Sequence, residues 1–131
     1  MNQICGTIHN IKKYDKIYDV YIDYENHILN VILLENPLLK KDLKKYKKVN
    51  LYFKEFAPII SKKRIKNIIK IENEFKLQIE KIQKGKVFHL LKLKNHKDYF
   101  YVYIKDCLHN FNLKDTIYIY IKPTDFILEL L

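Results

Sequence analysis

The sequence is poor in the residues that interrupt regular structure. Its 131 residues include only two glycines and three prolines, a scarcity that argues against a disordered chain and against long irregular loops. No apolar run reaches the length needed to cross a membrane, and nothing at the N-terminus resembles a signal peptide. The cytoplasm is therefore the expected compartment.

Cysteine and arginine are scarce as well, and each scarcity argues against a class of site. Cys5 and Cys107 have no CxxC spacing and no clustered histidines beside them, so we expect reduced, structural thiols. Arg64 is the only arginine, which argues against direct base reading because that readout favours bidentate arginine. We find no nucleophile with a base, no informative pair of carboxylates, no metal-ligand cluster and no glycine-rich phosphate loop. Neither a catalytic nor a metal site is expected, and an enzyme is the least favoured class.

Apolar residues and lysine are abundant. Hydrophobic residues make up 48% of the chain, with eleven tyrosines and seven phenylalanines, which is enough for a packed core. The net charge of +10 favours an anionic partner: a nucleic acid, a membrane surface or a small oxyanion. A solvated lysine-rich surface accounts for the same charge equally well.

An internal repeat organises the sequence. The stretch VNLYFKEFAPII (Val49–Ile60) returns as IYIYIKPTDFIL (Ile117–Leu128), and in each copy an alternating apolar run ends at a lysine, Lys54 or Lys122. Residues of turn character and a second apolar run follow each lysine, a pattern that predicts strand, corner and strand.

The repeat extends to the openings of both halves. Asn2–Ile11 aligns with Asn73–Ile82 without a gap. Two modules are therefore predicted, at residues 1–62 and 73–131, with a linker at 63–72. Modules this small are marginal alone, so we expect them to share a core or to oligomerise.

Five short strands are expected in each module. In the first module they are Asn2–Ile11, Ile17–Tyr24, Ile28–Leu34, Val49–Phe53 and Ala57–Ile60. In the second they are Phe75–Ile82, Val87–Leu93, Tyr99–Ile104 and the two strands that flank Lys122. Gly6 inside the first strand indicates a bulge or the close approach of another backbone.

A short helix is expected between the third and fourth strands of each module. Asn36 suits an N-cap and Pro37 the first helical position, and Leu38, Leu39 and Leu43 give an apolar stripe. The corresponding segment of the second module, Asp106–Phe111, has room for one turn. The predicted fold is mainly β, with two tandem OB-like five-stranded barrels.

The NQICGTI opening, the strand order, the corner lysine and the direct duplication together resemble the molybdate-binding Mop (TOBE) domain. Tandem copies of that domain form the di-Mop molbindins and the C-terminal part of molybdate-responsive transcription regulators. The resemblance implies modules that exchange strands and assemble into homo-oligomers such as dimers or trimers. It also implies a tetrahedral oxyanion, molybdate or tungstate, bound at intermodule or intersubunit interfaces, for storage or as the effector of a regulator.

The resemblance also implies which residues bind the oxyanion. The family uses the corner lysine, the opening Asn-Gln pair and Ser or Thr hydroxyls, and the candidates here are Lys54, Lys122, Asn2, Gln3, Thr124 and Ser61. Four positions depart from the family pattern: Met1 stands where the family has arginine, Leu34 and Pro37 replace small hydroxyl residues, and the carboxylate of Glu55 would repel an oxyanion. In a regulator, a separate domain would contact DNA. No membrane partner is expected.

Two other functions fit the same residues. A nucleic-acid-binding OB module would use lysines for phosphates and tyrosines for stacking, with Tyr99, Tyr101 and Tyr103 along one sheet face. Alternatively, the chain is an assembly module that keeps the fold and has lost its ligand. Stabilisation by an oxyanion would favour the oxyanion-binding function, and steep salt dependence of oligonucleotide binding would favour the nucleic-acid-binding module.

Overall fold

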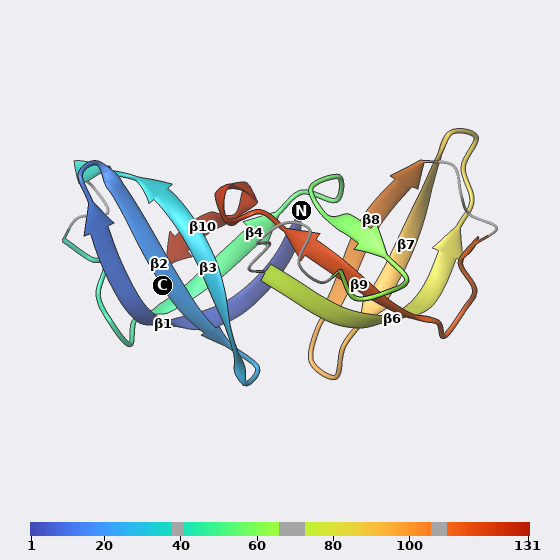
Figure 1. Cartoon of the computed structure of the whole chain (residues 1–131), viewed down its shortest axis with the longest axis horizontal. Helices are drawn as coiled ribbons and strands as arrows, with labels where there is room; N and C mark the ends of the chain where they lie inside the picture. The colour runs from blue at the N-terminus through green and yellow to red at the C-terminus, as the bar shows by residue number, and fades with distance from the viewer. Residues whose placement is uncertain (38–40, 66–72, 106–109) are drawn as a thin grey trace. The chain divides into compact units, whose positions relative to one another are not determined.

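The computed structural model describes residues 1–37, 41–65, 73–105 and 110–131 (Figure 1). Its elements are β1 (Asn2–Tyr14), β2 (Ile17–Tyr24), β3 (His27–Leu34), β4 (Lys48–Phe53), β5 (Ile59–Ser61), β6 (Asn73–Gln83), β7 (Phe88–Lys94), β8 (Tyr99–Lys105), β9 (Thr116–Ile121), the 3₁₀ helix η2 (Pro123–Asp125) and β10 (Ile127–Leu130). Within the described residues, no helix is long and apolar enough to cross a membrane. The chain is mainly β, as predicted.

The strands form two five-stranded antiparallel sheets. The first has the order β10-β4-β1-β2-β3 and the second β5-β9-β6-β7-β8. Contacts divide the chain into two compact units: unit 1 contains Met1, Gln3–Phe53 and Lys122–Leu131, and unit 2 contains Asn2 and Lys54–Ile121. Two sheets of five strands agree with the predicted OB-like fold.

One edge strand of each sheet, β10 or β5, comes from the other half of the sequence. In unit 1, β10 pairs with β4 from Ile127 opposite Tyr52 to Leu130 opposite Val49. In unit 2, β5 pairs with β9 in the equivalent place. The strand exchange that the family resemblance implies is therefore present. The predicted boundaries at residues 62 and 73 follow the sequence repeat. The contacts instead place β10 in unit 1 and β5 in unit 2, each with the sheet that it joins.

Alternation along the strands builds the core of each unit. On β2 the buried residues are Tyr18, Val20, Ile22 and Tyr24, and Asp19, Tyr21 and Asp23 lie on the other side. On β6, Phe75, Leu77 and Ile79 are buried in the same alternating way. Such period-two burial is the pattern of a sheet with one face on a core.

Both units contain a β-bulge near the middle of their first long strand. The register shifts between Ile8 and Asn10 on β1 and between Ile79 and Lys81 on β6. Gly6 lies close to the β1 bulge, and a Cβ atom there would come within 2.9 Å of the Asp23 carbonyl oxygen. The close backbone approach predicted at Gly6 is confirmed.

The helix predicted between β3 and β4 is not found in the described residues. Pro37 has a helical conformation, Leu38–Lys40 lie outside the described residues, and 41–47 form turns. The end of this loop bonds both to itself, from the Lys47 amide to the Lys44 carbonyl at 3.3 Å, and to β1. The Tyr46 amide donates to the Ile8 carbonyl at 2.7 Å, and the Ile8 amide donates to the Lys47 carbonyl at 2.9 Å.

Unit 2 repeats this anchoring. The Lys114 amide donates to the Ile79 carbonyl at 2.7 Å, and the Ile79 amide donates to the Asp115 carbonyl at 3.0 Å. Tyr46 and Lys114, which make equivalent bonds, both have positive φ angles, 67° and 68°. Most of the turn predicted at 106–111 lies outside the described residues.

Candidate functional site

The two corner lysines have the same local geometry. Lys54 follows β4 and Lys122 follows β9, and both side chains are exposed. Each lysine carbonyl accepts the amide of the residue three positions later, from Ala57 at 3.0 Å and from Asp125 at 2.9 Å. The repeat seen in the sequence thus extends to the backbone of both corners.

In unit 2 the Lys54 corner is fastened to β8. The Tyr103 amide donates to the Glu55 carbonyl at 3.0 Å. The Phe56 ring stacks on the Tyr103 ring with centroids 4.7 Å apart and meets Phe88 edge-on at 5.2 Å. A backbone bond and two ring contacts therefore fix the turn that presents Lys54.

Asn2 holds the same strand two residues away. Its side-chain amide donates to the Tyr101 carbonyl at 2.8 Å, and its side-chain carbonyl accepts the Tyr101 amide at 2.7 Å. Asn2 is 4% exposed, so both bonds are largely shielded from water. The structure thus brings two predicted site residues, Asn2 and Lys54, to neighbouring positions along β8, and the amide of Asn2 is already bonded to protein.

In unit 1 the Lys122 corner continues into η2. Lys122 is the N-cap in an extended conformation, Pro123 follows at the first position, and Thr124 is exposed. Phe126 behind the turn is 4% exposed and packs edge-on against Phe53 at 5.7 Å. Lys122 and Thr124 therefore stand close in sequence on an anchored turn, both open to solvent.

Gln3 and Ser61 are placed differently. Gln3 follows Asn2 on β1, so strand alternation directs its exposed side chain to the opposite face. The Ser61 hydroxyl donates to the Lys63 carbonyl at 2.6 Å and accepts the Lys63 amide at 3.2 Å. Ser61 is thus engaged in a local turn at the end of β5.

The departures around Leu34 and Pro37 leave a surface unsuited to a dianion. Both residues are exposed, and with Lys16 and Glu35 they line an open pocket of about 510 Å³ in unit 1. The Glu35 carboxylate bonds to the Lys13 ammonium at 2.9 Å and raises the pKa of Lys13. At this position the chain has the Glu35 carboxylate, already paired with Lys13, where the family has hydroxyl groups.

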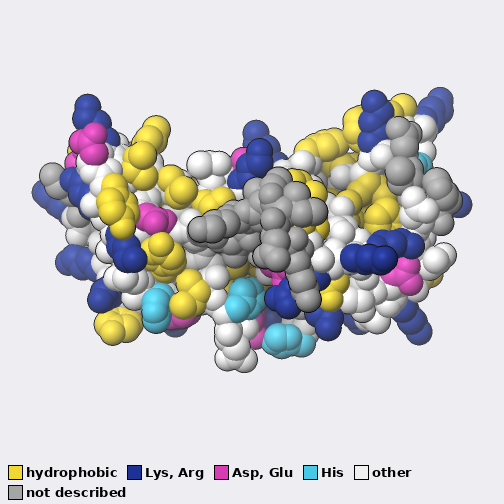
Figure 2. Space-filling view, viewed as in Figure 1, with side chains coloured by type: hydrophobic (Ala, Val, Ile, Leu, Met, Phe, Trp, Pro, Cys, Tyr) yellow, Lys and Arg dark blue, Asp and Glu magenta, His cyan; other side chains and the backbone are white. Residues whose placement is uncertain are grey.

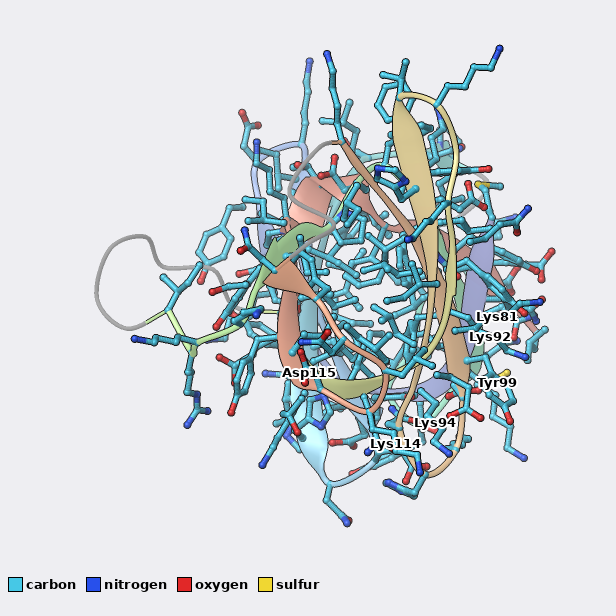
Figure 3. All side chains as sticks on the ribbon, turned by 90° about the vertical axis from the view of Figure 1, so that its right-hand side faces the viewer. Lys81, Lys92, Lys94, Tyr99, Lys114 and Asp115 are labelled. Carbon is cyan, nitrogen blue, oxygen red and sulfur yellow. The ribbon has the colours of Figure 1, made fainter. Side chains whose placement is uncertain are left out.

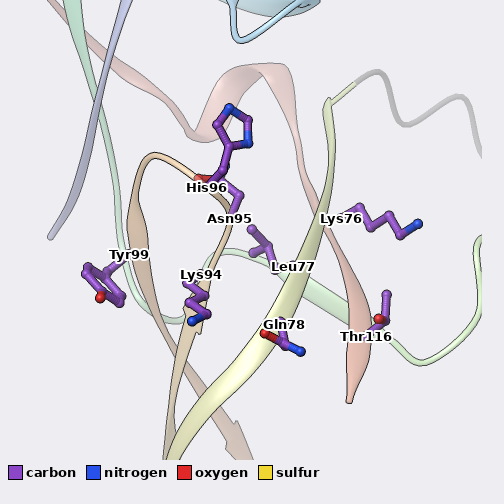
Figure 4. Close-up of a pocket in the computed structure, with 8 residues that line it drawn as sticks. All are labelled: Lys76, Leu77, Gln78, Lys94, Asn95, His96, Tyr99 and Thr116. Carbon is purple, nitrogen blue, oxygen red and sulfur yellow. The ribbon is translucent and has the colours of Figure 1, made fainter. Parts of the chain in front are cut away.

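A second pocket was not expected from the sequence. About 580 Å³ in volume, it lies in unit 2 and is lined by Lys76, Leu77, Gln78, Lys94, Asn95, His96, Tyr99 and Thr116 (Figure 4). Lys76 and Lys94 are 18 positions apart in the sequence (94 − 76), and the pairing of β6 with β7, which sets Lys94 opposite Gln78, is what brings their strands together. Among the described residues, the side chains that line this pocket are mostly polar and include no carboxylate.

Comparisons with known proteins bear on the fold. No family model matches the chain, and no curated protein matches it. Among solved structures, the cytoplasmic molybdate-binding protein ModG with molybdate bound matches with a TM-score of 0.89 at 15% identity, over 99% of this chain and 96% of that one.

Two further structures are far less similar. One, described under structural mimicry for functional antagonism, has a TM-score of 0.32 at 12% identity over 98% of this chain and 92% of that one. The other, a murine DNA-binding protein bound to double-stranded DNA, has a TM-score of 0.32 at 9% identity over 100% and 99%. Neither score supports an inference. The ModG match supports the Mop-type fold over nearly the whole chain.

Proposed function

We propose that this protein binds a tetrahedral oxyanion, molybdate or tungstate, at its two corner lysines. The observation that carries the proposal is the full-length similarity in fold to a molybdate-binding protein, combined with an exposed lysine at the same anchored turn after β4 and after β9. Binding requires no catalysis. The compartment we propose is the cytoplasm, the location given for that neighbour.

The chemistry of a dianion suggests how such a site is completed. Removing a dianion from water requires matching charge and several hydrogen-bond donors. Within the described residues the Lys122 corner offers one ammonium group and the Thr124 hydroxyl, and the Lys54 corner offers one ammonium group. Because this is too few donors for a buried dianion, we propose that a second copy of the chain supplies the rest, in a dimer or trimer.

The remaining candidates take different parts in this proposal. Asn2 acts by holding β8 beside the Lys54 corner, since its amide is committed to Tyr101. Gln3 remains a proposed donor, and Ser61 becomes one only when its hydroxyl leaves the Lys63 carbonyl. A ligand shared between copies would favour assembly by linkage, which suits either a storage protein or the effector part of a regulator.

The first experiment is thermal unfolding with millimolar molybdate, tungstate or sulfate at constant ionic strength. A ligand present at about 100 times its Kd stabilises the folded state by about 2.7 kcal/mol. We expect molybdate or tungstate to raise the unfolding temperature and sulfate to leave it unchanged. Lys122→Gln and Lys54→Gln should each reduce the rise, whereas Lys44→Gln, at a matched exposed lysine in the loop before β4, should not.

The outcomes separate the alternatives. An equal rise with all three anions at constant ionic strength would indicate unselective anion binding and refute a selective site. A rise that survives both corner substitutions would refute the proposed residues. No rise with any anion would refute the proposal and favour an assembly module without ligand.

A further inference from the structure

One face of unit 2 combines lysines and tyrosines on three adjacent strands. We define the Lys–Tyr face by six of the outward side chains of β6, β7 and β8: Lys76, Lys81, Lys92, Lys94, Tyr99 and Tyr101. Glu74, Gln78 and Tyr103 lie on the same side of the sheet. The register places Lys81 opposite Lys92, Lys92 opposite Tyr101 and Lys94 opposite Tyr99. Adjacent strands are about 4.8 Å apart, so these side chains form a continuous surface.

The groups on this face are available to a ligand. Among the described residues, Lys94 alone of the four lysines has an ion-pair partner, Glu80 at 3.1 Å. The Lys92 ammonium lies 4.3 Å from the centroid of the Tyr99 ring. Tyr99 is 53% exposed and Tyr101 39%. In Figure 3, Lys81, Lys92, Lys94 and Tyr99 lie next to one another at one edge of the view.

Lysine is common over the whole surface, as Figure 2 shows for one side of both units, so its presence alone would decide little. Unit 1 serves as a control for unit 2, because the internal repeat gives each position on this face an equivalent in unit 1. Because the bulges align, the positions of Lys81, Lys92 and Lys94 correspond in unit 1 to Asn10, Tyr21 and Asp23.

The rest of the equivalent face in unit 1 is also different. Lys76 corresponds to Cys5 by the same register, and Tyr99 and Tyr101 correspond to Ile28 and Asn30. The unit 1 face does carry Lys12, which lies opposite Asp19. The same backbone thus bears a basic, aromatic face in one unit and a face with two aspartates in the other.

The charge difference includes an exchanged pair. In unit 1 the bulged residue His9 contacts Asp23 at 3.1 Å, and in unit 2 the bulged residue Glu80 contacts Lys94 at 3.1 Å. Both units keep this cross-strand contact. The partner of the bulged residue is the carboxylate of Asp23 on β2 in unit 1 and the ammonium group of Lys94 on β7 in unit 2. The fold therefore does not require the positive charge on β7.

We propose that the Lys–Tyr face of unit 2 binds single-stranded nucleic acid. Lysines supply contacts to phosphates, and exposed tyrosine rings supply stacking surfaces for bases, the combination used by sequence-tolerant binders of single strands. The open pocket of about 580 Å³ at the Lys76, Lys94 and Tyr99 end has room beyond that of a small oxyanion. The near absence of arginine predicts little sequence preference.

This proposal is independent of oxyanion binding, because it uses neither corner lysine. Its test is fluorescence anisotropy of a labelled oligonucleotide of about 12 nucleotides, within the site size of one OB fold, at salt from about 50 to 200 mM. We expect single strands to bind more tightly than a duplex of the same length. The slope of log K against log salt should be negative, with about 0.7 for each phosphate contact.

Substitutions locate the site. Lys81→Gln with Lys92→Gln should weaken binding about tenfold at low salt and reduce the slope by about 1.4, the value for two phosphate contacts. The matched double variant Lys44→Gln with Lys45→Gln removes the same charge from exposed residues of unit 1 and should change neither quantity. Tyr99→Ala should weaken binding about tenfold and Tyr99→Phe much less, because the ring face is kept.

Each contrary result overturns the proposal. Absence of binding at low salt refutes it outright. Equal losses in the two lysine double variants would show attraction by net charge alone, and equal losses for Tyr99→Ala and Tyr99→Phe would rule out stacking. Binding to anionic vesicles without binding to oligonucleotides would assign the face to a lipid surface instead. Unfolding curves of every variant show whether any loss reflects unfolding.

Discussion

Replacing Asn2 by leucine should destabilise unit 2 by about 2 to 4 kcal/mol. Leucine has nearly the shape of asparagine but makes neither of the bonds to the backbone of Tyr101, at 2.7 and 2.8 Å. Each lost hydrogen bond contributes about 1 kcal/mol net, and a buried group left without a partner costs about 1 to 3 kcal/mol. Because Asn2 is 4% exposed, water cannot easily replace the lost partner.

Denaturant unfolding and amide hydrogen exchange together test this prediction. Exchange of the Tyr101 amide should accelerate, since its acceptor is lost, while the Tyr103 amide keeps its bond to the Glu55 carbonyl at 3.0 Å. Gln3→Leu is the matched control on the exposed side of the same strand and should change stability by less than about 0.5 kcal/mol. Equal effects of the two substitutions, or unchanged exchange at Tyr101, would refute the reasoning.

Three further predictions concern the packing of the fold. Phe126→Ala should cost about 3 to 5 kcal/mol because the ring is buried, whereas Phe56→Ala, at a ring 61% exposed, should cost much less; a comparable loss of unfolding free energy in both would contradict this. Gly6→Ala should cost about 1 to 3 kcal/mol, because its Cβ would lie 2.5 Å from a methyl carbon of Ile22, and an unchanged denaturation midpoint would count against that approach. Glu129 has a lowered pKa because its carboxylate accepts bonds from Asn50 and from a tyrosine hydroxyl, so it stabilises β10 above the ordinary carboxyl pKa and this contribution is lost as pH falls through the lowered pKa. Glu129→Gln should therefore be less stable than the wild type at neutral pH and approach it in acid, and a gap independent of pH would exclude the carboxylate as its cause.

The elements that the sequence predicted well are those governed by local alternation. The run from Tyr18 to Tyr24 alternates in burial as predicted, because a strand with one face on a core has a period of two. The two corners were predicted from the repeat, since a lysine after an apolar run and before turn residues recurs at Lys54 and Lys122. Local pattern was sufficient in these cases because neighbouring residues determine the conformation.

Features that depend on distant partners were not predictable from local pattern. The helix expected after Asn36 falls largely on residues 38–40, outside the described residues, and nothing local to the loop indicated that its end bonds to the bulge at Ile8. Asn2 was a predicted ligand residue by resemblance, and its bonds to Tyr101, 99 positions away, give it a further role in holding a strand. Neither partner lies within the window in which a local pattern operates.

The Lys–Tyr face illustrates a third limit. Counting by twos from Leu77 and Ile79 would place Lys81 on the buried side of β6. The bulge between Ile79 and Lys81 adds one residue and turns Lys81 outward, opposite Lys92. A sequence can reveal the lysine, but its face depends on a bulge that only the register reveals.

The duplication separates what the fold requires from what it permits. Both units keep the bulge, the loop bonded to it and the cross-strand contact beside it, as His9 with Asp23 or Glu80 with Lys94. Features kept despite such divergent side chains are the ones that the backbone needs. Charge and aromatic rings on the outer face differ between the units, so the fold does not need them there. Substitutions on that face should therefore change binding far more than stability.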